Sequence, residues 1–220
     1  MNIGVKGIPK QTEEFSEKVS SLATVLAFKI SDLEDYDLVF DLSFDLDQSN
    51  WSLYAGQKKV PVVLGTAGIQ LEALVHTSGI KPKGNIIGMN TLPTFINRSL
   101  AEVCSVNDAE SEILQPLLEK LGFTCEWVGS RVGLVTPRVL LMIINEAFFT
   151  VQEGTATKED IDLGMKLGTN YPTGPFEWCD KIGLEYVYKT LKAIYQDTHD
   201  ERYKICPMLK TAYLRHPEAK

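Results

Sequence analysis

The chain has 220 residues, and 44% of them are hydrophobic, which is enough to build a folded core. Its formal net charge of −7 argues against a general nucleic-acid binder and against a protein that adheres to anionic membranes, because both need a basic surface. The longest apolar run, VLLMIIN from Val139, is too short to span a bilayer. Four cysteines show neither metal-site spacing nor a disulfide framework: Cys104, Cys125, Cys179 and Cys206. We therefore expect a cytoplasmic protein with reduced thiols and no bound metal.

Short apolar segments alternate with helical ones through the first half of the chain. Six segments read as strands: 2–7, 24–30, 37–44, 60–66, 85–89 and 124–130. Amphipathic patterns predict helices over 10–23 and 108–123. Because strands that alternate with helices form parallel sheets, this half is predicted to be a parallel α/β sheet.

From about Arg131 the pattern becomes helical throughout. Residues 136–154 are apolar around most of the helix circumference, which is typical of a helix buried in a bundle or at a subunit interface. A second helix is predicted over 157–168, with Thr157 as its N-cap and Asp160 completing a capping-box-like pair. A third helix covers 183–197. We therefore predict two domains, residues 1–130 and residues 131–220.

One segment of the helical half carries a specific pattern, NEAFFTVQEGTATKEDIDLGMKLGTNYPTGPFEWCDKIGLEYV, which begins at Asn145. This segment resembles the NAD-dependent 3-hydroxyacyl-CoA dehydrogenases. Its hallmarks are NEA at 145–147, EDID at 159–162 and PTGPFE at 172–177. Two segments of the first half, YDLVFDL from Tyr36 and residues 88–103, are similar to stretches of the same family.

The resemblance implies a fold, a reaction and a cofactor. The expected fold is a truncated Rossmann-like parallel sheet followed by an all-α helical domain, through which members of the family form homodimers. Truncation is expected because only SDLED, residues 31–35, separates the second strand from Tyr36, where the family has several dozen residues. The family oxidises 3-hydroxyacyl-CoA to 3-ketoacyl-CoA with NAD, in fatty acid metabolism.

The positions that match the family's catalytic residues hold different side chains. Glu102 matches the family glutamate, and the histidine base twelve positions earlier is replaced by Asn90, whose amide accepts no proton. The family's serine falls on Ala67, and its asparagine falls on Pro137, beside Arg138. Loss of a general base costs about 10²- to 10⁴-fold in rate, and loss of one positioned donor about 10²- to 10³-fold. We therefore predict that catalysis is lost or much reduced.

The opening sequence IGVKGIPKQT departs from the family's G-x-G-x-x-G nucleotide turn. Gly7 keeps the first glycine, whereas Pro9 and Thr12 replace the second and third. The second glycine lets the backbone approach the pyrophosphate, and a proline there adds bulk and removes an N–H. Asp32, twenty-five positions after Gly7, is the candidate for the acid that binds the ribose. The resemblance thus implies NAD at Gly7 and Asp32, and Pro9 and Thr12 oppose its binding.

The three histidines leave other sites open. His76 ends a helix predicted over 69–78, where the helix dipole favours a surface histidine, and His199 and His216 lie in polar segments. A dehydrogenase with a rearranged site would use His76 or a water molecule as its base. An enzyme of another reaction would use Glu102 as acid or base, since apolar neighbours raise the pKa of a glutamate.

The prediction that best fits these patterns is a dimeric family member that binds acyl-CoA or partners an active paralogue. Four lysines are candidates to contact phosphates of CoA: Lys58, Lys59, Lys81 and Lys83. Neither nucleic acid nor a membrane is expected as a partner.

Overall fold

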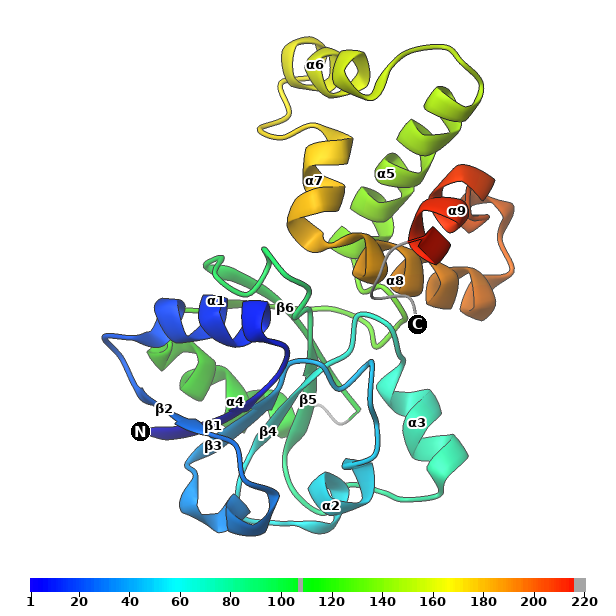
Figure 1. Ribbon diagram of the computed structural model, residues 1–220. Helices are drawn as coiled ribbons and strands as arrows, with labels where there is room; N and C mark the ends of the chain where they lie inside the picture. The colour runs from blue at the N-terminus through cyan, green and yellow to red at the C-terminus, as the bar shows by residue number, and fades with distance from the viewer. Residues whose placement is uncertain (107–108, 216–220) are drawn as a thin grey trace. The chain divides into compact units, whose positions relative to one another are not determined.

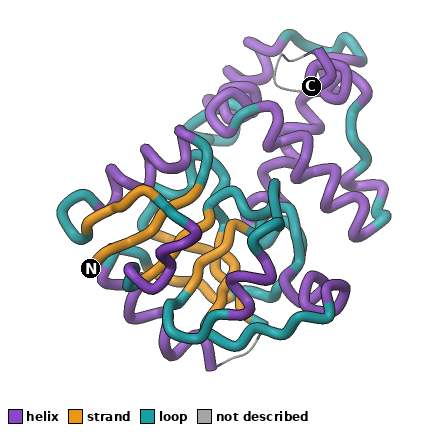
Figure 2. The backbone as a smooth tube through the Cα atoms, turned by 60° about the horizontal axis from the view of Figure 1, so that its bottom comes forward, coloured by secondary structure: helices purple, strands orange, loops and turns teal. Residues whose placement is uncertain are grey.

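The structure is a computed structural model that describes residues 1–106 and 109–215, apart from the side chains of residues 30, 32 and 109–111. The chain divides into two compact units, Met1–Leu134 and Val135–Lys220. The first unit contains the strands, whereas the described residues of the second are helices and their connections (Figure 2).

A seven-stranded sheet forms the centre of the first unit (Figure 1). Its strands are β1 (Asn2–Lys6), β2 (Thr24–Ala27), β3 (Leu38–Asp41), β4 (Val62–Gly65), β5 (Ile86–Met89), β6 (Leu100–Ser105) and β7 (Thr124–Trp127). They lie in the order β2-β1-β3-β4-β5-β6-β7, and every neighbouring pair is parallel except β5 and β6. The predicted fold class is confirmed, with one antiparallel pair in place of an all-parallel sheet.

Strand β6 was not predicted from the sequence. Only residues 90–99 join β5 to β6. A parallel crossover needs a dozen or more residues, so this connection is too short and β6 returns antiparallel to β5. The antiparallel return sets residues after β5 directly opposite residues of β6.

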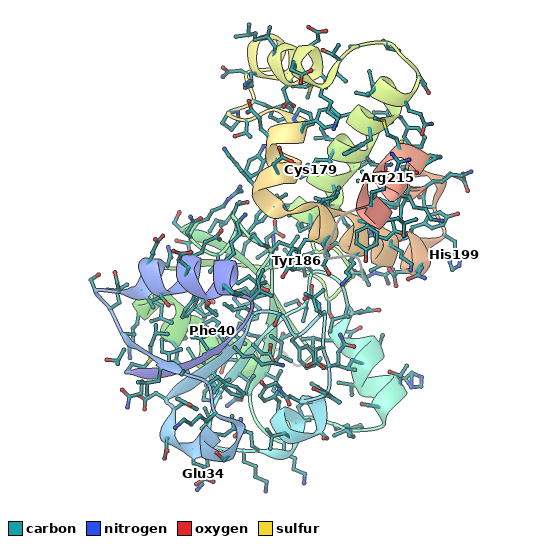
Figure 3. The ribbon with its side chains drawn as sticks, viewed as in Figure 1. Glu34, Phe40, Cys179, Tyr186, His199 and Arg215 are labelled. Carbon is teal, nitrogen blue, oxygen red and sulfur yellow. The ribbon has the colours of Figure 1, made fainter. Side chains whose placement is uncertain are left out.

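Helices cover both faces of the sheet. Helices α1 (Pro9–Val19) and α4 (Ala109–Lys120) pack on one face, and α2 (Trp51–Gly56) and α3 (Leu71–Ser78) on the other. Side chains alternate along β3, so that Phe40 joins the first core, 4.5 Å between ring centroids from Phe15, while Val39 joins the second. Figure 3 shows Phe40 in the interior of this unit.

Strand β2 is an edge of the sheet, and an aromatic ring closes the space beside it. A short 3₁₀ helix, η1 (Ile30–Asp35), leads from β2 towards β3. After it, the Tyr36 hydroxyl donates to the Ala27 carbonyl at 2.9 Å. The Tyr36 ring lies so close to β1 that a side-chain carbon at Gly4 would meet it at 3.0 Å. Gly4 therefore has room for the ring only because it has no side chain.

The second unit is a helical bundle. Its elements are α5 (Thr136–Gln152), α6 (Lys158–Gly168), α7 (Pro175–Ile182), α8 (Leu184–Thr198), the 3₁₀ helix η2 (Glu201–Tyr203) and α9 (Pro207–Arg215). Helices α5, α6 and α8 were predicted, whereas α7, η2 and α9 were not. Of the helices that the structure describes, none has the length and apolar character required to cross a bilayer.

Several hallmark residues of the helical half cap its helices. Thr157 is the N-cap of α6, as predicted, and its hydroxyl accepts from the Asp160 N–H at 3.1 Å. The Asp162 carboxylate accepts from the N–H groups of Phe176 and Glu177, at 2.8 and 3.2 Å. It thereby satisfies two donors in the first turn of α7, which have no partner within that helix.

Asn145 holds the C-terminal part of this unit against α5. Its side chain is 3% exposed. The Asn145 amide nitrogen donates to the Lys204 carbonyl at 2.9 Å, and its oxygen accepts from the Cys206 N–H at 2.8 Å. One buried amide therefore satisfies both backbone groups at the entry to α9.

We predict that Asn145→Ala destabilises the protein by about 2 kcal/mol, because it leaves a buried backbone donor and acceptor without partners. Urea unfolding followed by circular dichroism measures the change. Gln196→Ala, which truncates an exposed side chain of α8, serves as the control and should leave the free energy of unfolding nearly unchanged. Equal effects of the two substitutions would contradict the anchoring role of Asn145.

Candidate functional site

The candidate site lies at the carboxyl edge of the sheet. The chain leaves β1 towards β2 on one side, and β3 lies on the other side of β1. In doubly wound sheets, ligands bind outside the carboxyl ends of the strands at such a switch point. Here the segments that follow β1, β3, β4 and β5 meet at this edge.

Asn90 and Glu102 face each other there. Met89 and Val103 are register partners, and the Asn90 N–H donates to the Glu102 carbonyl at 3.0 Å, so the two residues are directly opposite in the antiparallel pair. Directly opposed side chains lie on the same face of a sheet, about 5 Å apart at Cβ. Both are buried, at 4% and 7% exposure. The structure thus brings together the two residues that sequence matching paired.

The buried Glu102 has a cationic neighbour, Arg98, in the connection between β5 and β6. Burial lowers the pKa of the Arg98 guanidinium, and the carboxylates of Glu102 and Glu14 oppose that shift. The guanidinium lies over the Phe95 ring, 4.3 Å from its centroid. A buried carboxylate is costly without a compensating charge. The positive charge near Glu102 comes from Arg98.

The other two sequence-matched positions carry no reactive group. Ala67 follows β4, is fully buried, and accepts a hydrogen bond at its carbonyl from the Gly133 N–H at 2.8 Å. Pro137 is a buried residue in the first turn of α5, in the second unit. Its neighbour Arg138 forms an ion pair with Asp197, with 3.6 Å between Nη2 and Oδ2. Neither Ala67 nor Pro137 has a side-chain hydrogen-bond donor.

The turn that follows β1 is closed by Gln11, a residue that sequence reasoning missed. Its Oε1 accepts from the Ile8 N–H at 3.2 Å, and its Nε2 donates to the carbonyls of Leu42 at 2.8 Å and Thr91 at 2.9 Å. Gln11 is 1% exposed. A glutamine at the third position of a helix commonly accepts from the N-cap N–H, but nothing in the residue type signals the bonds to Leu42 and Thr91. Its burial shows only in the fold.

An ion pair also crosses the switch point. Lys6 of β1 and Asp41 of β3 are register partners, with 3.2 Å between Nζ and Oδ2. The Tyr54 hydroxyl donates to the same Asp41 oxygen at 2.9 Å. Asp41 is fully buried, and burial raises the pKa of its carboxyl above the ordinary value of 3.8 although Lys6 and Tyr54 act against this shift.

The remaining candidates lie elsewhere or outside the described groups. Asp32 is in η1, five residues beyond the end of β2, and its side chain is not among those described, so its role stays a prediction. His76 is exposed in the last turn of α3, His199 ends α8 (Figure 3), and His216 lies outside the described residues. Within the first unit, which contains Asn90, the sequence has a single histidine, His76, and it lies in α3.

The four candidate lysines lie at the opposite edge of the sheet. Lys58 and Lys59 precede β4, and Lys81 and Lys83 precede β5, so all four belong to the amino ends of these strands. Lys59 pairs with Glu34 at 2.9 Å, and Figure 3 shows Glu34 at the lower end of the sheet unit. These lysines are therefore not part of the carboxyl-edge site.

Comparisons with known proteins agree on one family. Residues 133–216 match the family model described as "3-hydroxyacyl-CoA dehydrogenase, C-terminal domain". The chain is 31% identical over 206 residues to the 3-hydroxybutyryl-CoA dehydrogenase of Bradyrhizobium diazoefficiens, covering 90% of this chain and 69% of that protein. It is 32% identical to the probable 3-hydroxybutyryl-CoA dehydrogenase of Deinococcus radiodurans, covering 82% of this chain and 67% of that protein.

The fold agrees as well. The crystal structure of (S)-3-hydroxybutyryl-CoA dehydrogenase PaaH1 from Ralstonia eutropha superposes with a TM-score of 0.73, at 21% identity, over 96% of this chain and 92% of that one. The sheet topology and the helices of the second unit therefore define a protein with a Rossmann-like sheet and a helical domain. The chain belongs to the 3-hydroxyacyl-CoA dehydrogenase family, whose members are NAD-dependent.

The nucleotide turn does not fit a bound dinucleotide. Pro9 has no N–H to offer a phosphate, and the Ile8 N–H already donates to Gln11. At Gly7, a side-chain carbon would lie 3.1 Å from Leu42 Cβ, so Leu42 already fills the space beside the turn. As for metals, the described residues contain no group of three or more His, Cys, Asp or Glu side chains placed to hold an ion.

We predict that the buried Asp41 charge makes the protein less stable as the pH rises. Because the pKa of Asp41 is raised in the folded state, the folded protein binds this proton more tightly than the unfolded chain. Its contribution to stability is therefore greatest below 3.8 and is lost as the pH rises through the raised pKa. Asp41→Asn keeps an oxygen that accepts from Tyr54 and should flatten this part of the curve, measured as Tm between about pH 4 and pH 7.

Asp47→Asn is the matched control, since it removes an exposed carboxylate 3.4 Å from the same Lys6 Nζ. A hydrogen bond from the Ser49 N–H lowers the pKa of Asp47, so its contribution has the opposite sign and is lost as the pH falls. Identical pH profiles for Asp41→Asn and the wild type would contradict the prediction.

Proposed function

We propose that this protein is a family member that has lost the dehydrogenase reaction, or most of it, and that serves as a dimeric acyl-CoA-binding or partner protein. The observation that carries the proposal is Asn90. It stands directly opposite Glu102, at the position where sequence matching expects the base, and an amide cannot take up the proton of a hydroxyl group.

The other groups at this edge do not replace the base. Glu102 is buried, and the cationic group near it is the guanidinium of Arg98, which is not a base that could take up a substrate proton. Ala67 offers no hydroxyl to a substrate oxygen. General acid–base catalysis contributes about 10²- to 10⁴-fold, and one positioned donor about 10²- to 10³-fold, so these losses together remove most of the rate enhancement.

The alternative, an active dehydrogenase with a rearranged site, would use His76 or a water molecule as its base. Helix α3 begins after β4 and ends before β5, which starts at the amino edge of the sheet. His76 is exposed in the last turn of α3. This position is towards the edge opposite Asn90, and so favours the first proposal.

A homodimer formed through the helical unit is part of the proposal. Helix α6 buries no side chain, and its Leu163 and Leu167 are 53% and 78% exposed. Residues four apart lie on one face of a helix, so these leucines form a continuous apolar strip. On α5, Val139 is 52% exposed. Exposed apolar side chains on these helices favour a protein interface.

Two further observations support an acyl-CoA ligand and a cytoplasmic location. The similar proteins are named as 3-hydroxybutyryl-CoA dehydrogenases, which favours a short acyl-CoA as ligand and a role in fatty acid metabolism. The four cysteines are free thiols, which suits a reducing compartment such as the cytoplasm.

We predict that acetoacetyl-CoA raises the Tm of the protein without supporting NADH oxidation. NADH absorbance, followed at high enzyme concentration, should show turnover at least about 10⁴-fold below the roughly 10 s⁻¹ typical of enzymes. Turnover within about a hundredfold of that value would contradict the loss of catalysis. No change in Tm with acetoacetyl-CoA would contradict acyl-CoA binding and leave the partner role.

Asn90→His is the companion variant in that assay. It returns an imidazole to the position opposite Glu102, while Ala67 and the nucleotide turn stay as they are. We expect no measurable NADH oxidation from it, because a base alone supplies neither the missing donor nor a place for the cofactor.

We predict that the wild type has the mass of a dimer at micromolar concentration and that Leu163→Glu/Leu167→Glu makes it a monomer. Light scattering after size exclusion measures the mass. Leu22→Glu/Ile113→Glu is the control, because it adds the same charge at two exposed apolar side chains, 49% and 48% exposed, in the sheet unit. A monomeric wild type, or dissociation by the control as well, would overturn this interface.

A further inference from the structure

We infer that Gln11 is a built-in occupant of the nucleotide crevice, so that the chain's own amide holds the place that a dinucleotide would take. This deepens the proposed loss of cofactor binding. The substitutions at Pro9 and Thr12 remove favourable contacts to a phosphate, but neither side chain links the segments that follow β1, β3 and β5. Gln11 links them.

The geometry of the amide carries the inference. Gln11 joins three segments that surround the switch point: the turn after β1 through Ile8, the segment after β3 through Leu42, and the segment after β5 through Thr91. Pyrophosphates in this fold lie between such segments, at the start of the helix that follows the first strand. With 1% of its surface exposed, Gln11 is buried among these three segments.

Further bonds draw the segments together around the amide. The Leu42 N–H donates to the Lys6 carbonyl at 2.7 Å, which extends the pairing of β1 and β3 past the end of β3. The Thr91 hydroxyl donates to the Leu42 carbonyl at 2.6 Å. It passes over Gly65, where a side-chain carbon would lie 2.3 Å from the Thr91 oxygen. The segments that follow β1, β3 and β5 are thus bonded to one another around the Gln11 amide.

A phosphate cannot simply displace the amide. The Gln11 Nε2 donates to two buried carbonyls, those of Leu42 and Thr91. An ionised phosphate is an acceptor only, so it would take the Gln11 donor away from both carbonyl oxygens, leave the Leu42 carbonyl with only the Thr91 hydroxyl, and bring negative charge against them. Lys6, the last residue of β1, already pairs with Asp41 and Asp47.

Two sets of substitutions test whether Gln11 blocks the binding of NADH. Pro9→Gly/Thr12→Gly restores the glycines of the turn and keeps Gln11. Pro9→Gly/Gln11→Ala/Thr12→Gly restores them and removes the amide. NADH fluorescence, titrated to about 1 mM without acyl-CoA, should show no saturable binding by the wild type or the double variant. The triple variant should bind at least about tenfold more tightly than the double.

Saturable binding by the double variant equal to that of the triple would overturn the inference, and so would a folded triple variant that does not bind. Circular dichroism establishes that each variant is folded. Either result leaves the turnover of the wild type unchanged, so the failure of this inference and the failure of the proposed function are distinguishable.

A measurement on the wild type covers the case in which the triple variant does not fold. The side-chain amide protons of Gln11, assigned in NMR spectra by their loss in Gln11→Met, should exchange slowly with solvent and keep their shifts when NADH is added. Fast exchange, or shifts that saturate with NADH, would show an amide that yields to the cofactor and would overturn the inference.

Discussion

The carbonyl oxygen of Leu42 is the point on which the carboxyl edge of the sheet depends. It is buried, and it accepts from both the Gln11 amide and the Thr91 hydroxyl, at 2.8 and 2.6 Å. Buried polar groups need partners, and these two donors come from α1 and from the segment after β5. A single acceptor therefore fixes how close three segments lie. The identity of Gly65, the burial of Thr91 and the closed turn after β1 all follow from keeping that oxygen satisfied from within the chain.

The residues that reveal the family are mostly residues that hold its helices together. Asn145 anchors the entry to α9, and Asp162 caps α7. Glu177 accepts from the Gly174 N–H at 3.1 Å and pairs with Lys166. Each of these side chains answers a hydrogen-bonding need of the helical unit. The hallmark pattern therefore reports on the stability of the helical unit and carries no information about whether the chain is catalytically active.

Much of the fold was predictable from the sequence, because apolar periodicity marks buried strands and long helices directly. The strands from β1 to β5, the helix α5 and the Thr157 cap are examples. Strand β6 was missed because its direction depends on the length of the connection from β5 and not on its own pattern. In the site, the pairing of Asn90 with Glu102 was implied by the family resemblance. The roles of Gln11 and Thr91 were not predictable, since each depends on Leu42, which is far away in sequence.

The contact between Tyr36 and Gly4 bears on how small a doubly wound sheet can become. In the usual arrangement of this fold, a further strand lies outside β2. Among the described residues β2 is the outermost strand on its side, and η1 leads directly towards β3. The Tyr36 ring, 6% exposed, packs on Gly4 of β1, the strand next to this edge, so the short connection itself covers part of the interior beside the sheet. The pairing of a tyrosine in the connection with a glycine in the neighbouring strand is a device that a designed miniature of this architecture can use.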